Sequence, residues 1–253
     1  MKALIVANWK MQPATFREAR ALFDATKKAA DAARGVQVIV APPAIFLREL
    51  SKGYRGRITF AVQNAHSATD TAHTGEISFA QARDARATYA LVGHAERRHP
   101  PTGGGEIDEE VRKKVAAALA ADIIPILCVG EVERTGSGEH FNFVKEQLRV
   151  GLKDVSPSNL KRVIITYEPL WTIGQPRPMD AREMHEMAIF IRKSIVESYG
   201  QAGMDIKILY GGSINEATAP DMLKNGDVKG LLVGRASADG SHVTRLLASI
   251  ANA

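Results

Sequence analysis

The chain has 253 residues, of which 45% are hydrophobic and 24% charged, proportions typical of a globular protein rather than a disordered or low-complexity one. Its 33 Lys and Arg exceed its 28 Asp and Glu by five, but the basic residues occur in short pairs with acids between them, which favours an ordinary solvated surface over a nucleic-acid interface. The single cysteine, Cys128, predicts a reducing, cytoplasmic setting, and no apolar run is long enough to indicate secretion or membrane insertion.

Short runs of β-branched and other apolar residues recur along the chain and predict strands. They cover residues 3–7, 36–40, 58–62, 89–92, 123–129, 163–167, 206–210 and 230–233. Segments rich in Ala, Leu, Glu, Lys and Arg lie between them with helical spacing, for example residues 15–33, 78–87, 106–121, 140–152 and 180–199. Seven intervals between residues 3 and 230 give a repeat of about 32 residues, the length of a βαβ unit.

Apolar strands that alternate with helices predict a parallel sheet covered by helices. The predicted fold class is therefore α/β, and eight such units without a Pro- or Ser-rich linker fit a (β/α)₈ TIM barrel that spans residues 1–253 as a single domain. An open doubly wound sheet is the alternative. That fold usually carries a glycine-rich turn after its first strand, where this chain has Asn8-Trp9-Lys10-Met11.

In a barrel of this kind, reactive side chains lie on the loops that follow the carboxyl ends of the strands. Those loops carry Asn8 and Lys10 after the first strand, His94 after the fourth and Glu168 after the sixth. Glu168 suits a general base beside apolar neighbours, and backbone N–H groups at a helix start favour a neutral His94 that donates to a carbonyl oxygen. Lys10 suits a fixed positive charge, with Asn8 orienting the same group.

Two glycine-containing turns follow the seventh and eighth strands, where such barrels often bind phosphate. They are Gly211-Gly212-Ser213 and Gly234-Arg235. His66 and His73 flank Asp70, but their spacing matches no zinc or calcium pattern, so no metal is predicted. Each residue taken alone has a purely structural alternative, such as a solvated surface group or a tight turn. Together they favour proton transfer beside the carbonyl of a small phosphorylated substrate.

Motifs along essentially the whole chain, in order and at compatible spacing, resemble those of one enzyme family. They are Ala7-Asn8-Trp9-Lys10-Met11, Gln63-Asn64, Thr74-Gly75-Glu76, Gly93-His94-Ala95-Glu96-Arg97-Arg98, Cys128-Val129-Gly130-Glu131, residues 167–174 (YEPLWTIG), Tyr210-Gly211-Gly212-Ser213 and Val233-Gly234. As a set they are similar to the signatures of the triosephosphate isomerase family. The resemblance implies reversible interconversion of dihydroxyacetone phosphate and D-glyceraldehyde 3-phosphate through an enediolate, in glycolysis and gluconeogenesis, by a cytoplasmic homodimer without cofactor or metal.

The resemblance also implies a role for each matching residue. Glu168 would move the proton between carbons, His94 would polarise the carbonyl, and Lys10 and Asn8 would stabilise and orient the substrate. The other implied residues are Gly174, Ser213, Gly234 and Arg235 at the phosphate, Glu96, Tyr210 and Cys128 in supporting positions, and Thr74 in a loop that approaches Asn8 and Lys10 of a second subunit.

The chain departs from the family's pattern in the implied lid, residues 169–178, where Pro176 has no amide hydrogen to donate to Ser213. We therefore hypothesise that the closed lid is held differently. Arg235 replaces a glycine, and arginine at this position resembles related isomerases of four-carbon erythrulose phosphates. The alternatives to the triose substrate are thus an erythrulose phosphate and, in another class, an inactive barrel that only binds a sugar phosphate.

Three further departures concern supporting positions. Ala95 replaces a serine that supports the histidine, and His73 replaces a large apolar residue of the dimer loop. The turn from Arg98 to Glu106 is longer than usual and is interpreted as a surface insertion.

Overall fold

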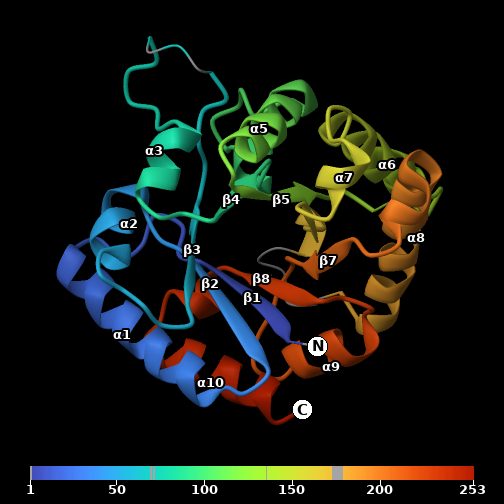
Figure 1. Cartoon of the computed structure of the whole chain (residues 1–253). Coiled ribbons are helices and arrows are strands. Elements are labelled where there is room, and N and C mark those ends of the chain that lie inside the picture. Colours follow the sequence, from blue (N-terminus) through green and yellow to red (C-terminus); the bar gives the residue numbers. More distant parts are fainter. Residues whose placement is uncertain (1, 69, 71, 135, 173–178) are drawn as a thin grey trace.

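The structure, a computed structural model, describes residues 2–68, 70, 72–134, 136–172 and 179–253, and within them strands alternate with helices around a closed parallel barrel (Figure 1). The strands are β1 (Ala3–Asn8), β2 (Val36–Ala41), β3 (Thr59–Val62), β4 (Tyr89–Val92), β5 (Ile124–Val129), β6 (Ile164–Tyr167), β7 (Lys207–Tyr210) and β8 (Gly230–Val233). Each strand pairs with its neighbours in chain order, and β1 pairs with β8 to close the barrel. The predicted TIM barrel is confirmed, and every predicted strand forms with ends that differ by at most one residue.

Helices cover the outside of the barrel. They are α1 (Phe16–Ala32), α2 (Ala44–Ser51), α3 (Phe79–Asp84), α4 (Ala95–Arg98), α5 (Asp108–Ala120), α6 (Glu139–Gly151), α7 (Pro157–Leu160), α8 (Ala181–Tyr199), α9 (Ala219–Asn225) and α10 (Gly240–Ala251), with 3₁₀ turns η1 (Leu170–Thr172), η2 (Gly200–Gly203) and η3 (Arg235–Ser237). Among the helices of the described segments, none is long and apolar enough to cross a membrane.

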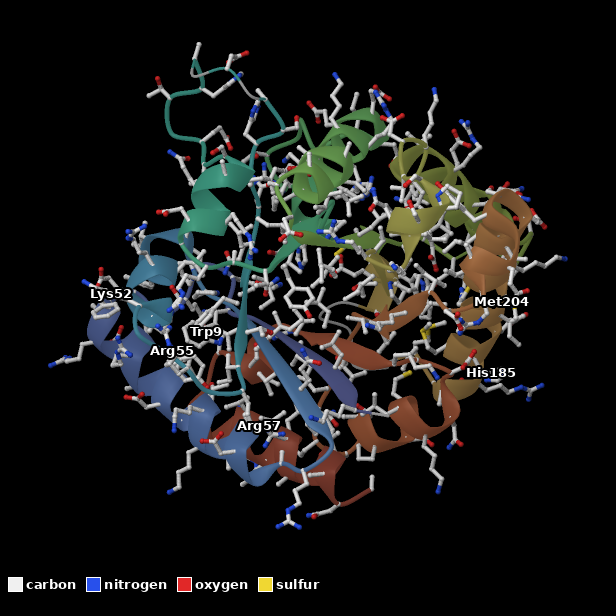
Figure 2. All side chains as sticks on the ribbon, viewed as in Figure 1. Trp9, Lys52, Arg55, Arg57, His185 and Met204 are labelled. Carbon is white, nitrogen blue, oxygen red and sulfur yellow. The ribbon has the colours of Figure 1, made fainter. Side chains whose placement is uncertain are left out.

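The strands are apolar on both faces because one face fills the barrel and the other packs against helices. In β1, Leu4 and Val6 belong to the cluster inside the barrel, whereas Ile5 and Ala7 belong to the larger cluster between barrel and helices. Trp9, only 1% exposed, continues this outer layer beyond the end of β1 (Figure 2). The two packed layers fix the strand ends, and therefore the loops that leave them.

Side-chain caps set the beginnings of several helices. Thr15 accepts from the Glu18 amide at the start of α1, and Asp180 accepts from the Glu183 amide at the start of α8. The predicted helix over residues 78–87 is shorter than expected, because α3 ends at Asp84 and Arg86 adopts a left-handed φ of 70°. The described elements thus deliver the ends of β1, β4, β6, β7 and β8 to one mouth of the barrel.

Candidate active site

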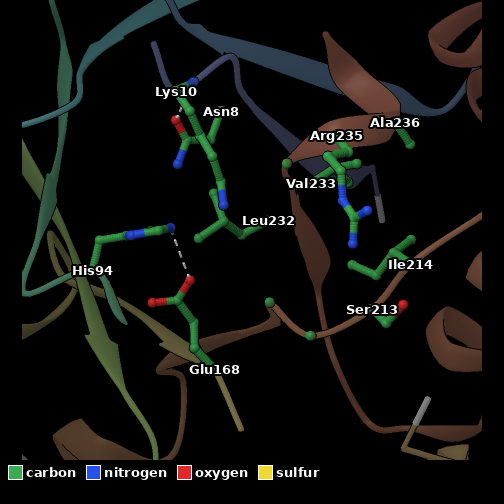
Figure 3. A pocket seen from close by; sticks show the side chains of 13 residues that line it. Asn8, Lys10, His94, Glu168, Ser213, Ile214, Leu232, Val233, Arg235 and Ala236 are labelled. Atoms are coloured by element: carbon green, nitrogen blue, oxygen red, sulfur yellow. Dashed lines mark hydrogen bonds and ion pairs between the residues drawn. The ribbon is translucent and has the colours of Figure 1, made fainter. Parts of the chain in front are cut away.

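A pocket of about 90 Å³ lies at the carboxyl ends of the strands (Figure 3). Its lining residues are Asn8, Lys10, His94, Glu168, Gly211, Gly212, Ser213, Ile214, Leu232, Val233, Gly234, Arg235 and Ala236. The structure therefore brings together all of the predicted catalytic residues and most of the predicted phosphate-binding ones. The predicted contribution of Gly174 lies outside the described residues.

Glu168 is the buried carboxylate of this pocket, with only 2% of its surface exposed. Its Oε2 accepts a 3.0 Å hydrogen bond from the Ala95 amide, and its Oε1 lies 3.3 Å from His94 Nε2. The amide that holds Oε2 belongs to the backbone, so the alanine at position 95 still supports the site without a serine hydroxyl. The carboxylate is oriented by two donors and shielded from water, as a general base requires.

His94 precedes α4, and its ring is held from the side opposite Glu168. The Glu96 amide donates to His94 Nδ1 over 3.2 Å. A nitrogen that accepts from an amide carries no proton, so this geometry suits a neutral imidazole with its proton on Nε2. That N–H faces the Glu168 carboxylate and the pocket (Figure 3).

The ammonium group of Lys10 is a cation of the pocket. The Lys10 backbone adopts a left-handed conformation, with φ 53°. Its amide donates to Asn8 Oδ1 over 3.0 Å, and Gln63 Nε2 donates to the Lys10 and Ala41 carbonyls over 2.8 Å each. These bonds compensate for a backbone conformation that costs about 1 kcal/mol or more. The Lys10 ammonium pairs with the exposed Glu96 carboxylate at 2.5 Å, at the rim of the pocket.

Small residues leave room around the charged groups. A methyl group at Gly211 would lie 2.8 Å from Glu168 Cγ, and one at Gly234 would lie 3.2 Å from Lys10 Cε. Arg235 begins η3, is exposed, and forms no ion pair with any residue that the structure describes. Figure 3 shows its guanidinium extending toward Ser213 and Ile214, away from Glu168. A free cation and exposed backbone at this end of the pocket suit an anionic group of a ligand.

Cys128 and Tyr210 lie buried behind the pocket, and neither lines it. Burial raises the pKa of the Cys128 thiol well above its usual range, and the Glu168 carboxylate adds to the effect. Burial likewise raises the pKa of Tyr210 to about 12, despite the nearby Thr172 hydroxyl. Both groups are therefore neutral near pH 7, where they provide packing rather than charge. Thr74 is exposed and does not line the pocket of its own chain.

Glu131 is a functional neighbour to which sequence reasoning assigned no role. It is 2% exposed and accepts from Tyr167 Oη at 2.7 Å and from Trp171 Nε1 at 2.8 Å. Arg134 lies over the Trp171 ring at 5.2 Å. Tyr167 and Trp171 flank Glu168 in the sequence, so this buried carboxylate fixes the segment that carries the base. The sequence feature that could have identified Glu131 is its position beside Gly130 in the motif Cys128-Val129-Gly130-Glu131.

Arg98 was also missed as an organising residue. Its side chain is 5% exposed and donates to the Gly93 carbonyl at 2.8 Å, to Asp108 at 2.5 Å and to the Cys128 carbonyl at 3.3 Å. It therefore ties the end of β4 to the start of α5 and to β5. The chain runs from β4 into His94, and β5 lies beneath Glu168. Arg98 therefore stabilises the placement of His94 relative to Glu168.

The long turn between Arg98 and Glu106 is only in part the surface insertion expected. Its tip, residues 101–104, is exposed. The side chain of Glu106 is 8% exposed and accepts at 2.6 Å from Lys114, which donates to Asn64 at 2.7 Å. The interpretation is wrong for Glu106, because the turn ends in a buried ion pair.

Near the same rim, the His66 and His73 rings lie 4.0 Å apart, and His73 Nε2 is 2.9 Å from Asp70. Within the described ranges, no three His, Cys, Asp or Glu side chains are placed to hold a metal ion.

Comparison with known proteins identifies what the chain is similar to. A family model described as triosephosphate isomerase matches residues 3–250. Triosephosphate isomerase of Endomicrobium trichonymphae is 38% identical over 97% of this chain and 98% of its own length. Those of Gluconacetobacter diazotrophicus and Aquifex aeolicus are 36% and 34% identical, covering 94% and 98% of this chain and 94% and 100% of their own lengths.

Proposed function

The chain belongs to the triosephosphate isomerase family, and from that premise we propose that it interconverts dihydroxyacetone phosphate and D-glyceraldehyde 3-phosphate through an enediolate. The observation that supports this most strongly is the approach of the buried Glu168 carboxylate to His94 Nε2, 3.3 Å apart in a pocket that also holds Lys10. A base, a neutral donor and a cation on one small pocket are what proton transfer beside a carbonyl needs.

In the proposed reaction Glu168 removes a proton from the hydroxyl-bearing carbon beside the carbonyl. The electron pair moves onto the carbonyl oxygen, where the Nε2–H of His94 donates a hydrogen bond to the developing charge. After the proton of that hydroxyl has moved to the former carbonyl oxygen, Glu168 returns its own proton to the former carbonyl carbon. A positioned base of this kind contributes about 10²- to 10⁴-fold in rate. Lys10 stabilises the same charge, and Asn8 holds the Lys10 backbone through its 3.0 Å bond.

The phosphate of the substrate is proposed to lie between Ser213 and Gly234, with the Arg235 guanidinium beside it. Gly174, the remaining member of this proposed subsite, falls outside the described residues. The hypothesis that Pro176 changes how the lid is held concerns the same undescribed segment. The Arg235 guanidinium, which forms no ion pair with any described residue, separates the proposed function from a second candidate, an erythrulose phosphate isomerase, because it lies at the mouth that a longer sugar must enter.

A coupled assay with D-glyceraldehyde 3-phosphate and an erythrulose phosphate, run on the parent protein and on Arg235→Gly, tests the substrate. We expect the parent to prefer the three-carbon sugar. Loss of one charge-assisted contact should lower its kcat/KM about tenfold through KM, which corresponds to about 1.4 kcal/mol. The four-carbon sugar loses the same contact but gains room, so the ratio of the two efficiencies should move toward it.

Arg235→Lys is the matched control, since it keeps the charge and should retain most of the affinity. If the ratio of kcat/KM for the two sugars is unchanged in Arg235→Gly, Arg235 does not discriminate between three-carbon and four-carbon substrates. A parent that prefers the four-carbon sugar would move the protein to the related isomerases. A folded parent that turns over neither sugar would leave the inactive sugar-phosphate-binding barrel.

We further propose a cytoplasmic homodimer in which the exposed Thr74 loop docks onto a second copy near Asn8 and Lys10. The free, buried thiol of Cys128 suits a reducing compartment. Sedimentation equilibrium of the purified 27.4 kDa chain is expected to give twice that mass. A monomer mass at micromolar concentration would contradict the proposed dimer.

A further inference from the structure

A second cavity lies at the opposite mouth of the barrel, where the strands begin. It has a volume of about 230 Å³ and is lined by the apolar side chains of Leu4, Ile124 and Ile164 together with Tyr89 and Gln37. Leu4 and Ile164 belong to the cluster that fills the barrel, and Ile124 packs against it, so they form a fixed floor. The other lining residues are all lysines: Lys2, Lys161, Lys207 and Lys229.

The four lysines are brought together by barrel closure and not by sequence. They stand at the beginnings of β6, β7, β8 and β1, which are consecutive neighbours around the barrel. The Lys229 amide donates to the Ile208 carbonyl at 2.8 Å, and the Lys229 carbonyl accepts from Leu4 at 3.0 Å. Lys207 is paired in register with Ile164. The backbones of Lys207 and Lys229 are therefore held by the sheet.

Among the described residues, no side-chain carboxylate neutralises this group of charges. None of the four lysines forms an ion pair with a residue in the described part of the chain, and no acid lines the cavity. Two acids that precede neighbouring strands are already paired, Asp122 with Arg83 and Arg162, and Asp227 with Arg192. Asp205 precedes Lys207 by two residues but is exposed and does not line the cavity.

The positive region continues beyond this cavity. An adjoining cavity of about 420 Å³ shares Lys2 and Lys229 with it and adds Arg34 and Lys224. Lys2 lines both cavities and therefore stands between them. Like charges held together over an apolar floor repel one another and raise the local concentration of anions.

We propose that this mouth of the barrel is a binding site for a small anion with two or more phosphate groups. Four ammonium groups exceed what one phosphate neutralises, and lysine binds phosphate as a mobile point charge. A cavity of about 230 Å³ accommodates a diphosphate, whereas a nucleic acid strand would need an extended groove or stripe. The site lies across the filled barrel from the catalytic pocket and shares no lining residue with it.

Calorimetric titration with inorganic pyrophosphate at low ionic strength tests the proposal on three proteins. These are the parent, the triple variant Lys161→Gln, Lys207→Gln, Lys229→Gln, and a control with the same loss of charge, Lys28→Gln, Lys52→Gln, Lys153→Gln. The control lysines are exposed and line neither cavity. We expect at least tenfold weaker binding in the triple variant, unchanged binding in the control, and affinity in the parent that falls as salt is added.

Competitive inhibition of isomerisation by pyrophosphate measures any binding in the catalytic pocket separately, and it should be equal in all three proteins. Equal calorimetric affinity in parent and triple variant, an equal loss in the control, or no binding by the parent would each overturn the proposal. The single variant Lys207→Gln guards against misfolding of the triple variant. It should raise the Tm of the ligand-free protein by relieving repulsion and reduce the increase in Tm that pyrophosphate produces; a lower ligand-free Tm with an undiminished increase would contradict the proposal.

Discussion

Glu168→Gln is expected to lower kcat about 10⁴-fold, the upper end of what a positioned general base contributes, while KM changes little. Glutamine has the same shape and its amide oxygen can still accept from the Ala95 amide, which the carboxylate does at 3.0 Å. The substitution therefore removes basicity and charge but keeps packing. Because the carboxylate is 2% exposed, water cannot readily replace it as the base.

The coupled assay measures kcat and KM, and thermal unfolding shows whether the variant keeps its fold. Glu96→Gln is the matched control, since that carboxylate is 57% exposed and acts by pairing with Lys10. Its kcat should fall by about tenfold or less, as exposed pairs contribute at most about 1 kcal/mol. A loss in Glu168→Gln no larger than in Glu96→Gln would place the base elsewhere.

The barrel could be predicted because its strands are apolar on both faces and stop where the apolar run stops. Residues 126–128 of β5 face the barrel interior and the helix layer in alternation, and all are buried. The run of apolar residues therefore marks the ends of β5 clearly. Helix ends were harder to predict. Residues 85–87 have helical composition, but Arg86 turns into the left-handed region and leads the chain into β4.

The side chains of the candidate site could be predicted for a related reason, since His94 and Glu168 come directly after strands that end at the same mouth. Interactions through the backbone carry no such signal. The amide of Ala95 holds Glu168, and Gln63 Nε2 donates to the carbonyls of Lys10 and Ala41, yet none of these bonds depends on a recognisable spacing. The lysine-lined mouth could not be predicted from composition, because its members are far apart in the sequence. The pairing of β6, β7 and β8, together with closure between β8 and β1, brings them side by side.

Alanine at Gly130 is expected to destabilise the protein by about 3 kcal/mol and to lower kcat about 10²-fold. A methyl group there would lie 2.0 Å from the Glu168 carbonyl oxygen and 2.5 Å from its carbon. Backbone cannot turn aside as a flexible side chain can, and Gly130 is itself held by its amide, which donates to Gln147 at 2.8 Å. The strain must therefore move the Glu168 backbone, whose amide donates to Val129 at 2.8 Å.

Gly136→Ala is the control, because no described atom outside its own chain neighbours lies within 4 Å of the added methyl group, and its effect should stay within about 0.5 kcal/mol. Urea unfolding measures the loss of stability, and kcat per folded protein measures the displacement of the base. A loss of stability without a loss of kcat would mean that the Ala95 and His94 contacts alone hold the carboxylate. Parent-like values for both would mean that the β5 and β6 ends separate without cost, which their close backbone contact argues against. A loss of both stability and kcat would show that the position of the Glu168 carboxylate depends on the absence of a side chain at Gly130, after the end of β5.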